Sequence, residues 1–233
     1  MIGLVLLRAL RAPATGRNAA LCASASPHVI LDDEFADLAR TAIEGDSVLN
    51  LANQHVELSA PFVMKGAMTL RIAGGSIIGS GHAIFQVGGS RKGLLELCDV
   101  KLQHMSSPER LEKRSLGAAL FARGKSRMAL RGCTISSEAG FGLWIVQKAR
   151  VEADSCDFLE SGRSSVVCFE DASVELDNTL ITDANCHAVC ARGDTRVVVR
   201  RSRIERAELR AIYCCNECGI RTDCLAGRSP SIS

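Results

Sequence analysis

Hydrophobic and polar positions repeat through the second half of the chain with a period of about 23 residues. Inside each repeat, apolar residues alternate with polar ones, which is the pattern of a β-strand that buries one face. Four repeats follow one another without gaps, and a fixed period of this length indicates a solenoid in which each repeat is one turn, or rung. The four rungs begin at Arg127, Arg150, Ser173 and Arg196.

Each rung contains three apolar strands, whose inward side chains fall at equivalent positions of successive rungs. We therefore expect three ladders of buried residues in a parallel coil whose turns lie about 4.8 Å apart. The first ladder contains Met128, Val151, Val174 and Val197. The second ladder contains Ile135, Phe158, Ile181 and Ile204. The third ladder contains Leu143, Val166, Val189 and Ile212.

Two other repeat architectures have comparable periods. Leucine-rich repeats require the spacing L-x-x-L-x-L-x-x-N, which the rungs do not have. Helical solenoids require an apolar spacing near 3.6, whereas these rungs have a spacing of two and are rich in β-branched residues. The sequence therefore predicts an all-β fold, a right-handed parallel β-helix with about 23 residues per rung.

The coil is expected to span residues 45–217 and to contain an insertion. A rung that begins near Lys92 joins the register of Arg127 only if about twelve residues, near 104–116, are treated as inserted. In that alignment, three cysteines fall at equivalent inward positions, where we expect them to pack as small buried hydrophobic side chains. This cysteine ladder contains Cys98, Cys133 and Cys156.

A short helix over residues 32–44 is expected to cap the first rung. The exposed first rung of a coil has unpaired backbone groups, and natural sheets protect such edges. Either Asp32 or Asp33 is a suitable N-cap residue, and Gly45 is a suitable stop.

Both ends of the chain are expected to lie outside the coil. Residues 1–31 contain no Asp or Glu and carry Arg8, Arg11 and Arg17, as an organelle transit peptide does. A plain disordered tail is the favoured interpretation of this segment, a transit peptide comes second, and a secretory signal is the least favoured. Residues 218–233 look irregular, so the last rung is expected to have no cap and to allow end-to-end self-association.

The rungs resemble the parallel β-helix repeats of the pectin-lyase-like superfamily over about residues 45–217. That superfamily contains polysaccharide lyases and hydrolases, and also intracellular interaction modules such as the β-helix F-box proteins. The Asn-Thr-Asp, Asp-Asp, Gly-His-Gly and Arg-Ile-Lys motifs of polygalacturonases do not occur here as a set. The resemblance therefore favours a non-enzymatic module that binds a protein partner. A carbohydrate-active enzyme acting on an acidic glycan is the alternative.

Four carboxylates are the candidate catalytic residues for this alternative. They are Glu152, Asp154, Glu175 and Asp177. Because they point outward from adjacent rungs, neighbouring carboxylates would lie about 5 Å apart, close enough to share a Ca²⁺ ion or to act as an acid and base pair. The simpler interpretation is a solvated charge ladder in which Arg131 and Arg200 flank Asp154 and Asp177.

Cysteine and histidine near the C-terminal end of the coil are the candidate zinc ligands. They are Cys186, His187, Cys190, Cys215 and Cys218. Cys215 and Cys218 have the spacing of a zinc knuckle, but the second pair that such a site needs is imperfect. Disulfide formation and simple packing in the rungs are the alternatives, and no cofactor is predicted.

A ladder of large apolar residues is expected on the outside of the third strand. Phe121, Trp144, Val167, Cys190 and Tyr213 occupy it. It contains the only Trp and the only Tyr of the chain. An exposed apolar ladder indicates a binding surface, here assigned to Phe121, Trp144, Val167 and Tyr213. A covered ladder or a reversed strand parity is the alternative.

Charge and cysteine content limit the choice of partner and compartment. The 28 basic and 26 acidic residues leave a formal charge of +2, which gives no field to attract nucleic acid or a membrane surface. The eleven cysteines are an odd number without regular spacing, so we expect most to be reduced. We expect an intracellular protein, cytoplasmic or organellar.

Overall fold

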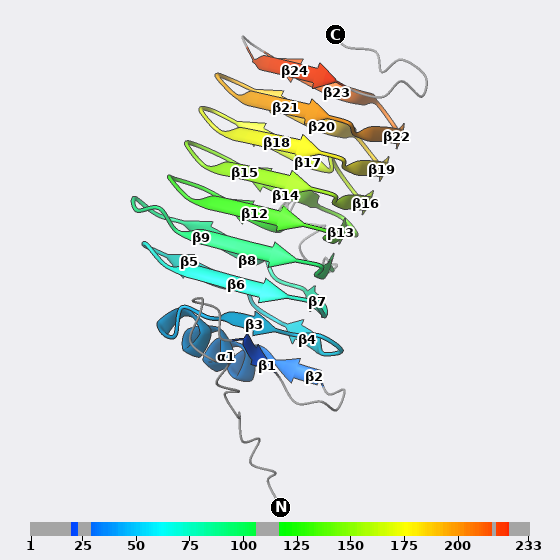
Figure 1. The fold of residues 1–233 in the computed structure, drawn as a ribbon. Helices are drawn as coiled ribbons and strands as arrows, with labels where there is room; N and C mark the ends of the chain where they lie inside the picture. Colours follow the sequence, from blue (N-terminus) through cyan, green and yellow to red (C-terminus); the bar gives the residue numbers. More distant parts are fainter. Residues whose placement is uncertain (1–19, 23–28, 106–116, 216–217, 224–233) are drawn as a thin grey trace, which may run out of the picture.

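Strands of successive rungs lie side by side and form three long parallel sheets (Figure 1). The computed structural model describes residues 20–22, 29–105, 117–215 and 218–223. One turn of the coil takes about 23 residues, and a single short helix lies at the N-terminal end of the stack. The prediction of an all-β parallel coil with this rung length is therefore confirmed.

The three sheets follow the three sides of the coil. Sheet A contains, in spatial order, β1 (Ala20–Cys22), β3 (Val48–Asn50), β6 (Thr69–Ala73), β9 (Leu94–Cys98), β12 (Arg127–Arg131), β15 (Arg150–Asp154), β18 (Ser173–Asp177), β21 (Arg196–Arg200) and β24 (Gly219–Asp223). Sheet B contains β2 (Val29–Leu31), β4 (His55–Leu58), β7 (Ser76–Gly79), β10 (Lys101–His104), β13 (Thr134–Ser137), β16 (Asp157–Ser161), β19 (Leu180–Ala184) and β22 (Arg203–Ala207). Sheet C contains β5 (Phe62–Lys65), β8 (Ala83–Gly88), β11 (Ala118–Ala122), β14 (Phe141–Ile145), β17 (Val166–Phe169), β20 (His187–Arg192) and β23 (Arg210–Cys215).

The core consists of stacked aliphatic side chains that point into the coil. Val174 is 2% exposed and is in register with Val151 and Val197 on the neighbouring strands. Alternate residues such as Glu175 point outward, because successive side chains of a strand face opposite sides. The three expected ladders lie in this core, although Ile204 is only partly buried.

The rung before Arg127 begins two residues later than expected. Leu94, rather than Lys92, is in register with Arg127, so the insertion adds ten residues to this rung instead of about twelve. The error kept the inward and outward parity within the strand itself, because strand side chains alternate with a period of two, but it misplaced the residues at the corner that follows. Leu95 faces inward in either alignment, and it is buried.

The cysteine ladder is corrected by the same shift. Cys98 lies opposite Arg131 and is exposed, so its expected place inside the coil was wrong. Val100 directly precedes β10 as Cys133 precedes β13, and it fills the corresponding buried position. Cys133 and Cys156 are buried as expected.

His104 belongs to β10 and not to the insertion, where we had placed it. Its side chain is 1% exposed, with Nδ1 2.9 Å from the Ser137 hydroxyl and Nε2 2.9 Å from the Gly81 carbonyl oxygen. These contacts explain why a histidine is tolerated inside the coil, since buried polar groups need partners. Most of the expected insertion, residues 106–116, lies outside the described residues.

Helix α1 (Asp32–Glu44) covers the first rungs, and its expected bounds are confirmed. Its buried face contains Phe35, Leu38, Ala39 and Ala42. The N-cap position is Leu31 and not Asp32 or Asp33, and no side chain caps the helix there. The Asp32 carboxylate instead accepts a hydrogen bond of 3.0 Å from the backbone N–H of Ser59 and so fixes the helix to the chain that follows β4.

Short strands extend the coil beyond both of its expected ends. Residues 1–31 are not wholly outside the fold, because β1 pairs with β3 and β2 pairs with β4. Residues 219–223, which we expected to be irregular, form β24 and pair with β21. Each of these strands is held by hydrogen bonds to the neighbouring rung. A segment of three to five residues has too few positions to show an apolar period, so the sequence alone did not reveal these strands.

Stacked residues with positive φ turn the chain at two corners of each rung. Between sheets A and B the stack contains Gly74, Asp99, Gly132, Ser155, Asn178 and Arg201. After sheet C it consists of Gly124, Gln147, Glu170 and Gly193. Because this conformation costs non-glycine residues free energy, its recurrence at equivalent positions shows that stacking of the rungs imposes it.

Acid sensitivity is expected at a corner of sheet B. Arg206 donates two hydrogen bonds, of 2.6 and 2.8 Å, to the Asp183 carboxylate and lowers the pKa of Asp183 to about 2. The depressed pKa stabilises the fold above the ordinary carboxyl pKa of about 4, and this contribution is lost as the pH falls through about 2. Urea unfolding between pH 5 and 2 should therefore show a shallower decline for Asp183→Asn. An unchanged slope would contradict this assignment.

Candidate binding surface on sheet C

A ladder of large apolar residues lies along the outer face of sheet C in the expected register. It contains Phe121, Trp144, Val167, Cys190 and Tyr213. Their neighbours in the strands, such as Leu143 and Ile145, point into the core and are fully buried. The strand parity assumed for the ladder is therefore correct, and its side chains point away from the core.

The ladder residues are half-buried instead of freely exposed. The Trp144 ring packs against Phe121 and Phe141, with centroid distances of 5.1 and 5.5 Å, and lies 6.1 Å from the His82 ring. Val167 is only 1% exposed, so its expected place on an exposed binding surface was wrong. The outer face is thus a packed aromatic layer on the solvent side of the sheet. This arrangement lies between the exposed ladder and the covered ladder that the sequence allowed.

Two ring nitrogens of this face have no hydrogen-bond partner among the described residues. They are Trp144 Nε1 and His187 Nδ1, and both atoms are buried. The His187 ring stacks on Tyr213 at 4.6 Å, and burial together with Arg210 lowers the pKa of His187. An unsatisfied buried polar group costs about 1–3 kcal/mol, so the packing of this face is not optimised for stability alone.

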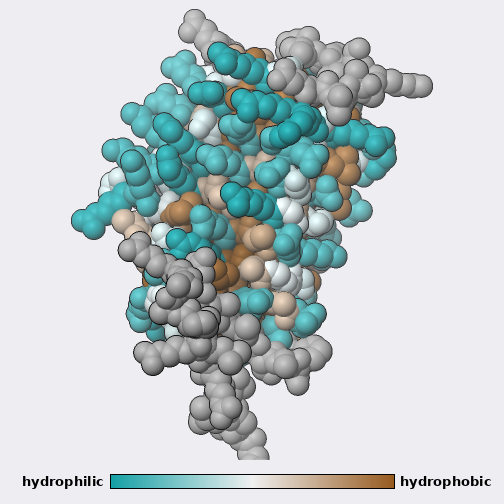
Figure 2. Space-filling view, viewed as in Figure 1, coloured by the Kyte–Doolittle hydropathy of each residue, from teal (hydrophilic) through white to brown (hydrophobic). Residues whose placement is uncertain are grey.

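Sheet A presents a different outer face, which carries the four candidate carboxylates. Glu152 is in register with Glu175, and Asp154 with Asp177. Figure 2 shows many hydrophilic side chains on this side of the molecule, with an apolar area near its middle. Glu152 and Glu175, together with Arg150, line a shallow hollow of about 320 Å³.

Arginine partners differ from those expected for this charge ladder. Arg200 donates to Glu175 at 2.8 Å, and Asp177 is held by Arg201, whose Nε donates to it at 2.8 Å. The hydrogen bond from Arg201 lowers the pKa of Asp177, which makes Asp177 a poor proton donor. Within the described residues, no three His, Cys, Asp or Glu side chains are grouped as a metal site, so these carboxylates do not form a Ca²⁺ cage.

The candidate zinc ligands are likewise not grouped around one point, as far as the described residues go. The Cys218 thiol donates to the backbone oxygen of Cys215, whereas His187 stacks on Tyr213. Burial raises the pKa of Cys190 to about 11, so this thiol stays protonated at neutral pH, although zinc binds the thiolate. No disulfide joins the described cysteines, Cys186 included.

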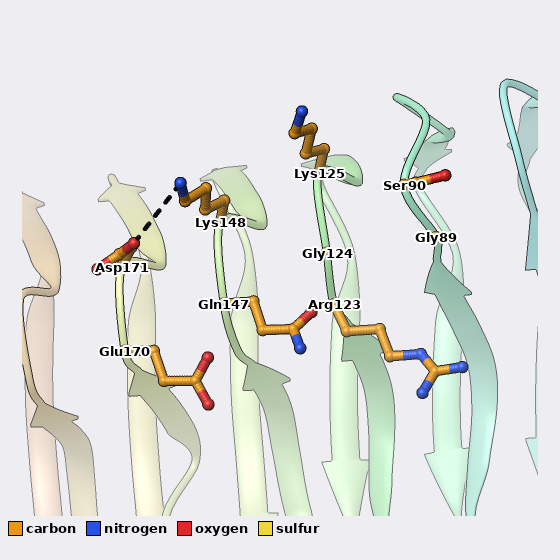
Figure 3. A pocket seen from close by; sticks show the side chains of 9 residues that line it. All are labelled: Gly89, Ser90, Arg123, Gly124, Lys125, Gln147, Lys148, Glu170 and Asp171. Atoms are coloured by element: carbon orange, nitrogen blue, oxygen red, sulfur yellow. Dashed lines mark ion pairs between the residues drawn. The ribbon is translucent and has the colours of Figure 1, made fainter.

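A hollow of about 550 Å³ lies at the corner that follows sheet C, and the sequence interpretation missed it. Figure 3 shows Arg123 and Lys125 at one end and Glu170 at the other, with Lys148 between them and directed towards Asp171. The Lys148 ammonium and the Asp171 carboxylate are 4.0 Å apart. The available signal was the stack of turn residues after each third strand, which follows the aromatic ladder by about three positions.

Comparison with known proteins shows the family but gives no individual relative. No curated protein and no solved structure matches the chain. Among the described residues, no helix combines the length and the apolar character needed to cross a membrane. A family model described as the right-handed β-helix region matches residues 62–224, and this agrees with the three stacked parallel sheets. The chain therefore belongs to the right-handed β-helix family.

Proposed function

We propose that the protein is a non-enzymatic β-helix module that binds a protein partner through the outer face of sheet C. The observation that carries the proposal is the outward aromatic ladder, which includes the only Trp and the only Tyr of the chain. Aromatic residues are enriched at the centres of protein interfaces, where each contributes a large contact area. The proposed setting is intracellular, in the cytoplasm or an organelle.

Sheets A and C differ in how far their outer side chains are already satisfied. On sheet A, Arg71 bridges Asp46 and Glu96 with contacts of 2.7 Å each, and Arg200 holds Glu175. On sheet C, half-buried apolar rings form the surface instead, and two unpartnered ring nitrogens are buried beneath it. Burial of such a face by a partner removes apolar area from water, which favours association.

A capture experiment with matched variants tests this surface. The wild-type chain, Trp144→Ala and the control Glu152→Ala are used to capture proteins from native extract, and the affinity of any shared partner is then measured with purified protein. We expect Trp144→Ala to weaken binding by about 30-fold, equivalent to about 2 kcal/mol, because Trp anchors are frequent hot spots. Its own stability should fall by only about 1–2 kcal/mol, since the side chain is half-buried.

The control lies on the outer face of sheet A and should bind the partner as the wild type does. A partner lost by Glu152→Ala and retained by Trp144→Ala would place the interface on sheet A and contradict the proposal.

A carbohydrate-active enzyme is the alternative, and the stacked carboxylates of sheet A are its only support. Purified protein incubated with polygalacturonate, with and without Ca²⁺, should leave the polymer intact, because Arg200 and Arg201 already occupy Glu175 and Asp177. Cleavage that disappears in both Asp154→Ala and Asp177→Ala would establish the enzyme and overturn the proposal.

A further inference from the structure

We infer that the partner segment bound by sheet C is an acidic peptide, whose apolar side chains pack on the aromatic ladder and whose carboxylates meet cations at the edges of the face. This inference rests on the proposed function and specifies the chemistry of the partner. It is carried by the charges of the seven strands and by their positions around the ladder.

All charged residues in the strands of sheet C are cations. None of these seven strands contains an Asp or a Glu. The strands of sheet A, by contrast, contain six acidic residues: Glu96, Glu152, Asp154, Glu175, Asp177 and Asp223. The cations within these strands of sheet C are Lys65, Arg192 and Arg210; directly after the strands lie Arg123, which follows β11, and the carboxylate Glu170, which follows β17. The whole chain is nearly neutral, so this one-sided distribution gives sheet C a local positive potential that the total charge conceals.

These cations are not neutralised within the described part of the protein, where none of the four forms an ion pair. Some arginines of the coil, such as Arg71, Arg200 and Arg206, are held by carboxylates, whereas others on sheet A, such as Arg127 and Arg150, form no ion pair among the described residues either. What distinguishes sheet C is therefore that its unpaired cations lie beside an apolar ladder in strands without a carboxylate. An unpaired arginine beside an apolar face is available to bind a carboxylate from outside, with the paired geometry that guanidinium groups favour.

The cations lie at the margins of the ladder. Lys65 is in register with Gly88, and the Arg123 side chain lies across Gly88, so close that a Cβ there would be 2.5 Å from the Arg123 Cγ. Arg192 occupies the position two residues after Cys190, on the same outer face. This arrangement, with an apolar centre and a charged margin, is that of a protein interface.

Arg123 also connects the face to the neighbouring hollow. It lines that hollow together with Lys125 and Lys148, while Glu170 and Asp171 occupy the opposite end (Figure 3). Charge repulsion disfavours an acidic side chain at the Glu170 end, and attraction favours it at Arg123. The polarity of the hollow therefore predicts that an acidic residue of the peptide lies nearest Arg123.

A peptide fits this surface better than a nucleic acid or a glycan. Bases and sugars bind to exposed ring faces, whereas the Phe121 and Trp144 rings are half-buried and tilted by 47° against each other. At the next position of the ladder, Val167 is only 1% exposed and offers no further ring for stacking. Four separate cations around an apolar centre also differ from the continuous basic groove that tracks a nucleic acid backbone.

Selection from a displayed library of random twelve-residue peptides, with the full-length chain as bait, tests the inference. We expect the selected peptides to be rich in Asp and Glu together with large apolar residues. The affinity of a selected peptide should fall with increasing salt, and by more than about tenfold when Arg123→Glu and Arg192→Glu are combined. The control combines Arg127→Glu and Arg150→Glu, the same charge change on the outer face of sheet A, and should bind as the wild type does.

Other results of the selection would contradict either the acidic character of the partner or the binding face itself. Neutral or basic peptides that need Trp144 but not the two arginines would overturn the acidic partner and leave the binding face in place. Selected peptides that are indifferent to Trp144→Ala, or a selection that yields no binder, would remove both proposals. Competition by polyuridylate or polygalacturonate at lower concentration than the best peptide would assign the face to a nucleic acid or a glycan.

Discussion

Val174→Asp is expected to lower the free energy of unfolding by about 3–5 kcal/mol, because it places an unpaired carboxylate in the middle of the core. Val174 is 2% exposed and lies between Val151 and Val197 on the inner ladder of sheet A. Each rung contacts only its neighbours, so the defect cannot be relieved by distant repacking. Urea unfolding followed by circular dichroism measures the loss.

Glu175→Lys is the matched control for this change, one residue further along β18. It removes the 2.8 Å ion pair with Arg200, but both side chains are more than a third exposed, so the cost should stay below about 1 kcal/mol. Comparable losses from both variants would mean that the inside and outside of sheet A are wrongly assigned.

Gly124→Ala is expected to destabilise the fold by about 2–4 kcal/mol, because it combines backbone strain with a steric clash. Gly124 has a φ of +71°, and an added Cβ would lie 2.3 Å from the backbone oxygen of Gly89 in the preceding rung. The oxygen belongs to the backbone and cannot rotate away, so the two rungs would have to separate. Thermal unfolding of the variant would report this cost.

Gly66→Ala separates the two causes. Gly66 has a similar φ of +89°, but an added Cβ would find no atom within 4 Å. This variant should therefore lose only the strain energy, about 1 kcal/mol. An equal loss at Gly66 and Gly124 would show that close stacking of the corners contributes nothing to stability.

The stacked core could be predicted from sequence because its signal is redundant. Four rungs without gaps repeat the same alternation three times each. Polar residues at a few inward positions, such as Thr179 and Ser202 in line with Cys133 and Cys156, therefore do not disturb the register. The bounds of α1 followed from a different signal, one apolar face that ends at Gly45. In both cases several residues indicate the same local structure.

The rung before the insertion was misaligned because a period of two cannot distinguish a shift by two residues. Leu95 lies inside the coil whether the rung begins at Lys92 or at Leu94. The corner was the better marker, since Asp99 with a φ of +55° corresponds to Gly132 with a φ of +60°. Short polar or glycine residues at the corner fix the register where the strands do not.

The candidate site was only partly visible in the sequence. Strand alternation placed Phe121, Trp144 and Tyr213 on one outer face, and the structure has this register. Their partial burial depends on rings from other positions, such as His82 and Phe141, which no period relates to the ladder. Pairing of the carboxylates was missed for a similar reason, because long arginine side chains reach across rungs.

Iodide quenching of tryptophan fluorescence tests the central claim most directly, because Trp144 is the only tryptophan and lies in the middle of the proposed binding face. In the unbound protein, a half-buried ring should give measurable quenching and an emission maximum shifted to the blue of free indole. Addition of a selected acidic peptide should reduce the quenching slope severalfold at saturation, since the bound segment would cover the ring. An unchanged slope at saturating peptide would contradict binding at this face.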